Sequence, residues 1–262
     1  EESKIIGTGV GADAFLGKPF NSEELTSTVR NLLQLKTGEK EIQRLNTFLT
    51  ESVLKRYLPP SLITEIIDGH ISMDRPAELR HVTVLFSDLC GFTKKSEVLG
   101  PQAIAELLNE YLTTMNDIIF DHGGTIDKFI GDAVMVMFGA PKDMPPEEQV
   151  ERACACAQDM QRAMVLIAKA WELRGAGDLK MRIGIHRGDA VVGNFGSDKR
   201  SDYTCIGPTV NLASRIEGAC EPGTVLVSET VFGYLSDTQA TRAGGFSLKG
   251  VDAEQSLYCL AK

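Results

Sequence analysis

The sequence has no long apolar run, no CxxC cysteine pair and no excess of basic residues. No stretch of its 262 residues approaches the roughly 18 apolar residues needed to span a bilayer, and no secretory leader pattern opens it. The six cysteines are expected to be reduced structural thiols in a cytoplasmic protein. Lys and Arg number 27 against 36 Asp and Glu, and the net charge of −9 argues against nucleic-acid or membrane partners. Any nucleotide site must therefore be local.

Apolar residues at helical spacing occupy the first part of the chain. They follow Asn21 and Ser22, either of which could cap a helix, and the pattern predicts an interruption at Thr37-Gly38. The apolar positions are Leu25, Val29, Leu32, Leu33, Ile42, Leu45, Leu49 and Val53. Because short helices are marginal alone, we expect them either to pair with a second copy as a parallel stalk or to pack on their own chain.

Strands and helices alternate from Pro76 onward. Apolar runs bounded by turn residues predict strands, and two long amphipathic stretches predict helices. The expected strands cover residues 80–88, 124–130, 133–138, 180–187, 189–195, 224–227 and 254–260, and the expected helices cover 101–121 and 146–174. A chain of this length can bury a sizeable core, so we expect one main domain with appendages.

Two carboxylates stand at the ends of these strands. In "VTVLFSDLCGFT" (82–93) an apolar strand ends on Asp88, and in "IGDA" (130–133) Asp132 lies in a turn between two strands. Either aspartate alone would be expected to be a solvated turn residue. If the strands are neighbours, however, the pair converges and offers hard oxygen ligands to Mg²⁺ or Mn²⁺, which serve phosphate chemistry. Gly91 can take a positive φ and turn backbone N–H groups toward an anion.

Four strings occur in order in this region: "FSDLCGFT", "KFIGDAVMVMFG", "RIGIHRGDAVVGNFG" and "GPTVNLASR". Together they resemble the catalytic domain of class III nucleotide cyclases, over residues 76 to 260. The resemblance implies a catalytic domain at 76–262 with a ferredoxin-like α+β fold, in which helices flank a mostly antiparallel central sheet. It also implies attack of a ribose 3′-hydroxyl on the α-phosphate of the same nucleotide, with pyrophosphate leaving.

The resemblance assigns roles to individual residues. Asp88 and Asp132, with the backbone carbonyl of Leu89, are expected to hold two Mg²⁺ or Mn²⁺ ions per active site. Asn211 would orient the ribose, and Arg215 would neutralise charge on the α-phosphoryl group. Their spacing of four places them on one face of a helix. The other expected phosphate contacts come from the backbone of Cys90, Gly91, Phe92 and Thr93, and from Lys249 in "SLKGV".

Two further residues are expected to select the base. Lys128 in "DKFIGD" is a donor that suits adenine N1, whereas guanine presents an N–H there and guanylate cyclases typically carry Glu. Thr204 in "YTCIGPTVN" both donates and accepts, so it can bind the adenine amino group but discriminates less sharply than the Asp of many adenylate cyclases. Thr at this place resembles the bicarbonate-stimulated subgroup. We therefore expect ATP as substrate and bicarbonate as a regulator.

Three alternatives compete with an adenylate cyclase. A guanylate cyclase is disfavoured by Lys128, and a diguanylate cyclase would carry GG(D/E)EF where "IGDA" stands. An inactive dimerising scaffold would lack a metal, base or transition-state residue, and none is missing. In the family the sites lie between two catalytic domains. Since this chain carries both residue sets once, the resemblance implies a homodimer with two shared sites.

The first part of the chain carries two weaker resemblances. "GVGADAFLGKPFNSEELTSTVRNLL" (9–33), with its Lys-Pro pair, resembles the last strand and helix of a response-regulator receiver domain. "YLPPSLITEIIDG" (57–69) resembles the transducer segment that precedes many cyclase domains. They imply a receiver remnant at 1–35 and a helical linker at 36–75, within a longer signalling protein. The alternative for the first is an ordinary strand-turn-helix.

Overall fold

The computed structural model of the chain describes residues 19, 21–52, 63, 66–67, 69, 76–92, 99–175, 177, 179–197 and 200–261. Contacts divide the chain into two units, Glu1–Arg56 and Tyr57–Lys262. The expected receiver strand, most of the expected transducer segment and Thr93 lie outside the described residues. Within the described ranges, no helix has the length and apolar character that crossing a membrane requires.

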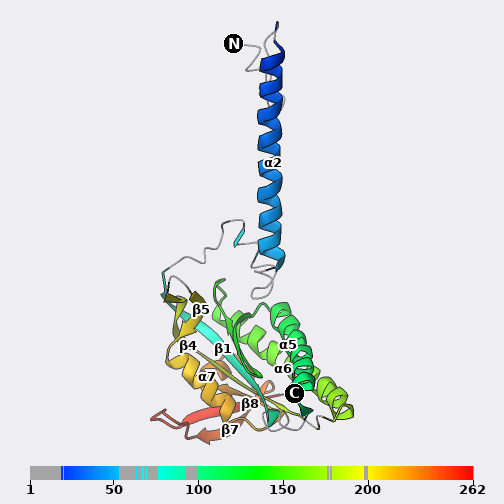
Figure 1. Ribbon diagram of the computed structural model, residues 1–262. Helices are drawn as coiled ribbons and strands as arrows, with labels where there is room; N and C mark the ends of the chain where they lie inside the picture. Colours follow the sequence, from blue (N-terminus) through cyan, green and yellow to red (C-terminus); the bar gives the residue numbers. More distant parts are fainter. Residues whose placement is uncertain are drawn as a thin grey trace. The chain divides into compact units, whose positions relative to one another are not determined.

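The first unit contains one long helix, α2 (Ser22–Ser52) (Figure 1). Asn21 caps it, since its Oδ1 accepts a hydrogen bond from the Glu24 N–H at 2.7 Å. The predicted interruption at Thr37-Gly38 is wrong, because the helix continues through both residues. The Thr37 hydroxyl donates to the Leu33 carbonyl one turn back at 2.7 Å, and a single interior glycine costs a helix only about 1 kcal/mol.

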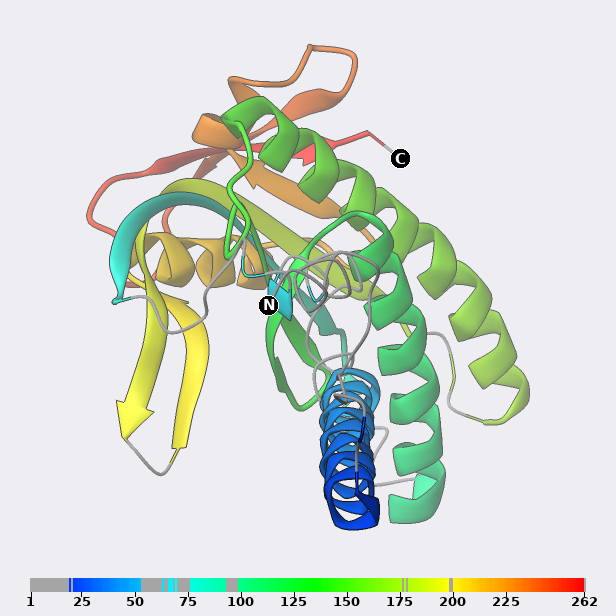
Figure 2. The same cartoon turned by 90° about the horizontal axis from the view of Figure 1, so that it is seen from above.

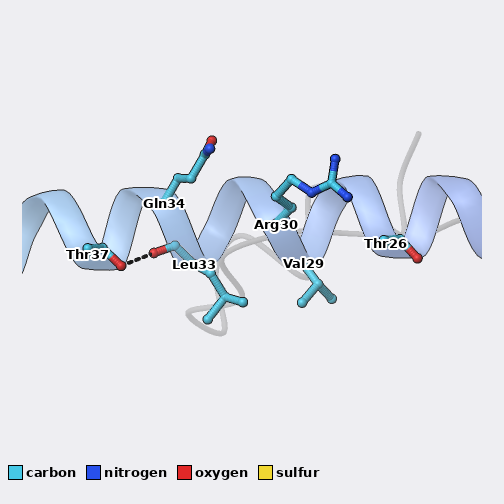
Figure 3. Close-up of a pocket in the computed structure, with 6 residues that line it drawn as sticks. All are labelled: Thr26, Val29, Arg30, Leu33, Gln34 and Thr37. Atoms are coloured by element: carbon cyan, nitrogen blue, oxygen red, sulfur yellow. Dashed lines mark hydrogen bonds between the residues drawn. The ribbon is translucent and has the colours of Figure 1, made fainter.

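Most apolar side chains of α2 are exposed. Leu33 is 61% exposed and Leu45 is 52% exposed. Figure 3 shows Val29 and Leu33 projecting from one side of the helix, while Arg30 and Gln34 project from the other. Pairing of this face with a second copy stays a prediction, as does packing on the same chain.

The second unit is built on one eight-stranded sheet with the order β2-β3-β1-β4-β6-β8-β7, and β5 pairs with β4 off this path. The strands are β1 (Glu78–Leu89), β2 (Thr125–Ile130), β3 (Ala133–Phe138), β4 (Met181–Ser197), β5 (Arg200–Ile206), β6 (Val225–Ser228), β7 (Ala240–Phe246) and β8 (Gln255–Leu260). Only the β4–β6 pair is parallel among the described pairings. The expected α+β fold with a mostly antiparallel sheet is confirmed.

Helices cover both faces of the sheet. Figures 1 and 2 show α5 (Pro101–Asp121) and α6 (Pro146–Leu173) side by side on one face, with α7 (Pro208–Gly218) across the sheet from them and the one-turn α8 (Glu229–Phe232) after β6. Strand β1 alternates between the two faces. Leu85 and Leu89 join the core beneath α5 and α6, whereas Val84 and Phe86 join the core that includes Ala213 of α7. By this period of two, Asp88 projects toward the α7 face.

The predicted strands differ from the structure at three places. Residues 180–187 and 189–195 form one strand rather than two, because Gly188 and Asp189 pair in register with β1 instead of turning. Strands β5 and β7 were not predicted from the sequence. Strand β7 is mostly exposed and contains Gly244 and Gly245, so it lacks the apolar alternation that predicts a strand. The six cysteines are free thiols, as expected.

Candidate active site

The two carboxylates expected to bind metal lie together at one end of β1. The register of β1 with β3 brings the β2–β3 turn beside Asp88, and Gly131 enters this turn with a φ of +67°. Asp132 Oδ2 accepts a hydrogen bond from the Leu89 N–H at 3.2 Å. Burial, followed by the negative charge of Asp88, raises the pKa of Asp132. The site therefore concentrates negative charge where solvent screens it incompletely.

An arginine and a glutamate that the sequence analysis missed complete this cluster. Arg182 faces Asp88 across the β1–β4 ladder, and its Nη2 lies 2.7 Å from Asp88 Oδ2. Its Nε lies 3.0 Å from Glu217 Oε1 on α7, a charge contact that lacks hydrogen-bond alignment. Burial raises the pKa of Glu217 to about 7, with Asp88 and Asp132 adding to the rise and Arg182 opposing it. The cluster thus holds three carboxyl groups around one guanidinium.

This donor set fits a divalent cation. Carboxylate oxygens are the ligands that Mg²⁺ and Mn²⁺ prefer, and burial together with the negative charge of Asp88 raises the pKa of Asp132, which a cation between the two carboxylates would offset. In the described part of the chain, no group of three or more His, Cys, Asp or Glu side chains could hold a metal. Asp88 and Asp132 would thus be the protein side-chain ligands, and backbone, water or nucleotide oxygens would supply the rest. This arrangement is typical of Mg²⁺ bound with a phosphate substrate.

The segment after Asp88 has part of the geometry expected of a phosphate cradle. Gly91 adopts a φ of +78°, as its place in the motif predicts. The Leu89 N–H is donated to Asp132, however, and the Cys90 N–H is donated to the Lys180 carbonyl at 2.8 Å. Phe92 turns its ring into the core, with its centroid 6.5 Å from that of Trp171. The expected backbone contacts to phosphate therefore rest on Gly91 and Phe92 in the described segment.

Lys249 lies in an exposed turn between β7 and β8, and Gly250 follows it with a φ of +78°. The turn leaves the ammonium free to reach a solvent-side ligand. Its expected phosphate contact stays a prediction.

The two residues expected to select the base contact each other. Lys128 Nζ lies 3.3 Å from Thr204 Oγ1, although β2 and β5 are far apart in the sequence. The carboxylate of Asp127, which the sequence analysis missed, joins both: Oδ1 lies 2.9 Å from Lys128 Nζ, and Oδ2 accepts a hydrogen bond from the Thr204 hydroxyl. A β-bulge between Ile126 and Lys128 lets the neighbours Asp127 and Lys128 meet the same partner.

Asn211 and Arg215 are both exposed on α7. Ala213 and Ile216 face the sheet, and Glu217 reaches Arg182 beside Asp88. At about 100° per residue, Arg215 lies roughly 160° around the helix from Glu217. Asn211 and Arg215 therefore project away from the carboxylate cluster of their own chain.

Comparisons with known proteins identify the family of this chain. The family described as the adenylate and guanylate cyclase catalytic domain matches residues 75–262. "Adenylate cyclase 1" of Rhizobium meliloti (strain 1021) is 35% identical over 206 residues, which are 77% of this chain and 30% of that protein. The chain thus spans about a third of that relative's length.

Two solved structures are similar to most of this chain. The adenylyl cyclase CyaB from P. aeruginosa is 38% identical with a TM-score of 0.70, covering 72% of this chain and 97% of that one. The guanylyl cyclase Cya2 is also 38% identical with a TM-score of 0.67, covering 71% of this chain and 94% of that one. The family match over residues 75–262 and the similarity of the fold to these structures lead to one conclusion: the chain belongs to the class III adenylate and guanylate cyclase catalytic domain family.

Proposed function

We propose that this chain is an adenylate cyclase that converts ATP to 3′,5′-cyclic AMP and pyrophosphate in signal transduction. The observation that carries the proposal is the contact between Lys128 Nζ and Thr204 Oγ1 at 3.3 Å. An ammonium beside a hydroxyl offers a donor for adenine N1 and an acceptor for the adenine amino group. Guanine, with its N1–H and its carbonyl O6, presents the opposite pattern.

The chemistry is divided between the two residue sets. Asp88 and Asp132 would bind two Mg²⁺ or Mn²⁺ ions, which when bound acidify the ribose 3′-hydroxyl and neutralise the triphosphate. Asn211 would hold the ribose so that its 3′-oxygen faces the α-phosphate. Arg215 would stabilise the negative charge that develops on the α-phosphoryl group and on the leaving oxygen.

The alternative activity is guanylate cyclase, which the 38% identity to the guanylyl cyclase Cya2 supports. The test is pyrophosphate release from ATP and from GTP by the same preparation with Mg²⁺ or Mn²⁺. We expect cyclic AMP formation with far lower GTP turnover. Equal turnover, or a preference for GTP, would contradict the assignment. Turnover of neither nucleotide would favour the inactive scaffold.

The active unit is proposed to be a homodimer with two shared sites. The exposed Asn211 and Arg215 project away from the Asp88 cluster of their own chain, which suits delivery to a partner's metal carboxylates. A two-fold interface brings the metal carboxylates of each subunit to Asn211 and Arg215 of the other. A related guanylyl cyclase domain from Blastocladiella emersonii, 26% identical, is described as a non-canonical dimer.

Complementation between two inactive variants tests this assembly. Asp88→Ala and Arg215→Ala proteins should each be nearly inactive, and co-expressed chains should form mixed dimers in which one site carries both lesions and the other carries none. With random pairing, half the dimers are mixed and half their sites are intact, so activity should return to roughly a quarter of wild type. Mixed dimers isolated with two different tags that show no activity would place each site within one subunit.

Two finer proposals concern regulation and domain organisation. Thr204 supports stimulation by bicarbonate, which would raise cyclic AMP formation at constant pH and ionic strength; a flat response to added bicarbonate would contradict it.

The proposed organisation places a receiver remnant at 1–35 and a helical linker at 36–75 before the catalytic domain at 76–262.

A further inference from the structure

Asp127 is a buried carboxylate that the proposed reaction does not use. Its side chain is 0% exposed, and it lies in β2 at the bulge that precedes Lys128. A charge this deeply buried is costly unless it is paired and hydrogen-bonded. Its partners are the Lys128 ammonium, the Thr204 hydroxyl, and the Cys205 N–H at 3.3 Å from Oδ2. Both residues proposed to select the base thus meet on one carboxylate.

The hydrogen-bond roles of these groups can be assigned from their chemistry. A hydroxyl has one hydrogen, and an ionised carboxylate only accepts, so the Thr204 hydroxyl donates its hydrogen to Asp127 Oδ2. The Cys205 carbonyl is the other acceptor near it, at the longer distance of 3.5 Å. With either acceptor, the Thr204 hydroxyl hydrogen is directed into the protein and away from a bound base. The lone pairs of Thr204 Oγ1 then face Lys128 and any base beside it.

Lys128 is held by the same carboxylate without losing its donors. Its Nζ lies 2.9 Å from Asp127 Oδ1, but the contact is not aligned as a hydrogen bond. One N–H is directed to Thr204 Oγ1 at 3.3 Å. Because an ammonium carries three donors, others remain for a ring nitrogen.

We propose that Asp127 is a positioning residue that sets the nucleotide preference of the site. By accepting the Thr204 hydrogen, it converts a hydroxyl that could donate or accept into an acceptor for an exocyclic amino group. By holding Lys128, it keeps a donor beside that acceptor. The acceptor-donor order matches adenine and opposes guanine. This inference rests on the proposed function of Lys128 and Thr204, and it explains how a threonine can select adenine as an aspartate would.

Asp127→Asn tests the assignment, because asparagine has the same shape but no charge to hold Lys128, and its amide N–H must replace an acceptor on one side. Toward Thr204 the N–H would face the hydroxyl and the Cys205 N–H and release the hydroxyl hydrogen; on the other side it would face the Lys128 ammonium. The ratio of kcat/KM for ATP to that for GTP should fall about tenfold or more, as expected when a buried hydrogen bond is mismatched. The matched control is Asp143→Asn, which removes an exposed carboxylate from its ion pair with Arg80. It should leave the ratio unchanged.

A rescue experiment separates positioning from a purely structural role. In the double variant Asp127→Asn/Thr204→Asp, the carboxylate at 204 is an acceptor without help, so the ATP preference should return. A folded Asp127→Asn protein that keeps the wild-type ratio would overturn the inference. Loss of preference without rescue would do so as well, because Asp127 would then act through structure alone. Absence of an ATP preference in the wild type would instead overturn the proposed function.

A second variant avoids any change at the buried carboxylate. In Thr204→Asn, an intact Asp127 should accept from the amide nitrogen and turn the amide oxygen toward the base. ATP should remain the preferred substrate, and the thermal midpoint should stay near that of the wild type. A switch to GTP in this variant would contradict the orienting role of Asp127 even if Asp127→Asn fails to fold.

Discussion

Replacement of Gly184 by alanine should displace α7 from the sheet. A Cβ at this position in β4 would lie 2.2 Å from the backbone N of Glu217, 2.6 Å from its Cα and 2.8 Å from the carbonyl oxygen of Ala213. All three are backbone atoms of α7, so no side-chain rotation can relieve the overlap. Ordinary van der Waals contact begins near 3.4 Å, and the helix must therefore move by about 1 Å.

The displacement should lower both stability and activity. Overpacking of this kind costs roughly 1–3 kcal/mol, which for a domain of this size lowers Tm by roughly 3–10 °C. Asn211 and Arg215 both lie on α7 and would move with it. A misplacement of about 1 Å can reduce turnover about a hundredfold, so kcat should fall more than the loss of folded protein explains.

Thermal denaturation followed by circular dichroism, together with cyclic-nucleotide formation below the midpoint, measures the two effects separately. Gly218→Ala is the matched control, since it adds a methyl group to the end of the same helix where no atom lies within 4 Å. The control should keep both Tm and kcat. If Gly184→Ala matched it within about 1 °C and twofold in kcat, close contact between β4 and α7 would not hold the helix in place.

Three other changes have defined outcomes. Arg215→Ala should lower kcat about a hundredfold or more with little change in KM in steady-state assays, and an unchanged kcat would remove it from the mechanism. Burial lowers the pKa of His186 to about 4, so as the pH falls this histidine is protonated in the unfolded chain before it is protonated in the folded chain. The free energy of unfolding should therefore fall by up to about 3 kcal/mol between pH 6.5 and pH 4. Denaturant titrations should show a smaller loss in His186→Gln, and identical losses would exclude this cause. Gly38 has open space around it, so Gly38→Ala should stabilise α2 by about 1 kcal/mol, measured as stronger protection of the α2 amides from hydrogen exchange. Reduced protection would contradict a continuous helix.

The parts of the fold that the sequence predicts are those with long periodic patterns. The predicted bounds of strand β1 and of helices α5 and α6 lie within two residues of the observed ends, because long apolar patterns mark each element. Strand β5 was missed because it projects from the path of the main sheet and carries few apolar residues. The predicted interruption of α2 at Thr37-Gly38 was wrong because a single glycine does not end a helix of 31 residues.

Only part of the candidate site could be predicted from the sequence. Motif strings identify Asp88 and Lys128, but neither Arg182 nor Asp127 can be recognised without pairing information. Arg182 meets Asp88 through the register of strands separated by two helices. Asp127 is next to Lys128, and regular alternation would place the two on opposite faces; the bulge brings both to Thr204. Such contacts depend on register, which local patterns leave open.

The central position of β1 has a consequence for biosynthesis. One edge of β1 pairs with β3, but the other edge pairs with β4, which lies beyond α5 and α6 in the sequence. During translation this apolar strand therefore emerges long before its second partner and leaves a row of backbone donors and acceptors unpaired. Pairings between segments so distant in sequence form slowly, and exposed strand edges promote aggregation while they wait. A chain truncated just before Met181 should accumulate as aggregate, whereas one that extends through β8 should reach the soluble fraction.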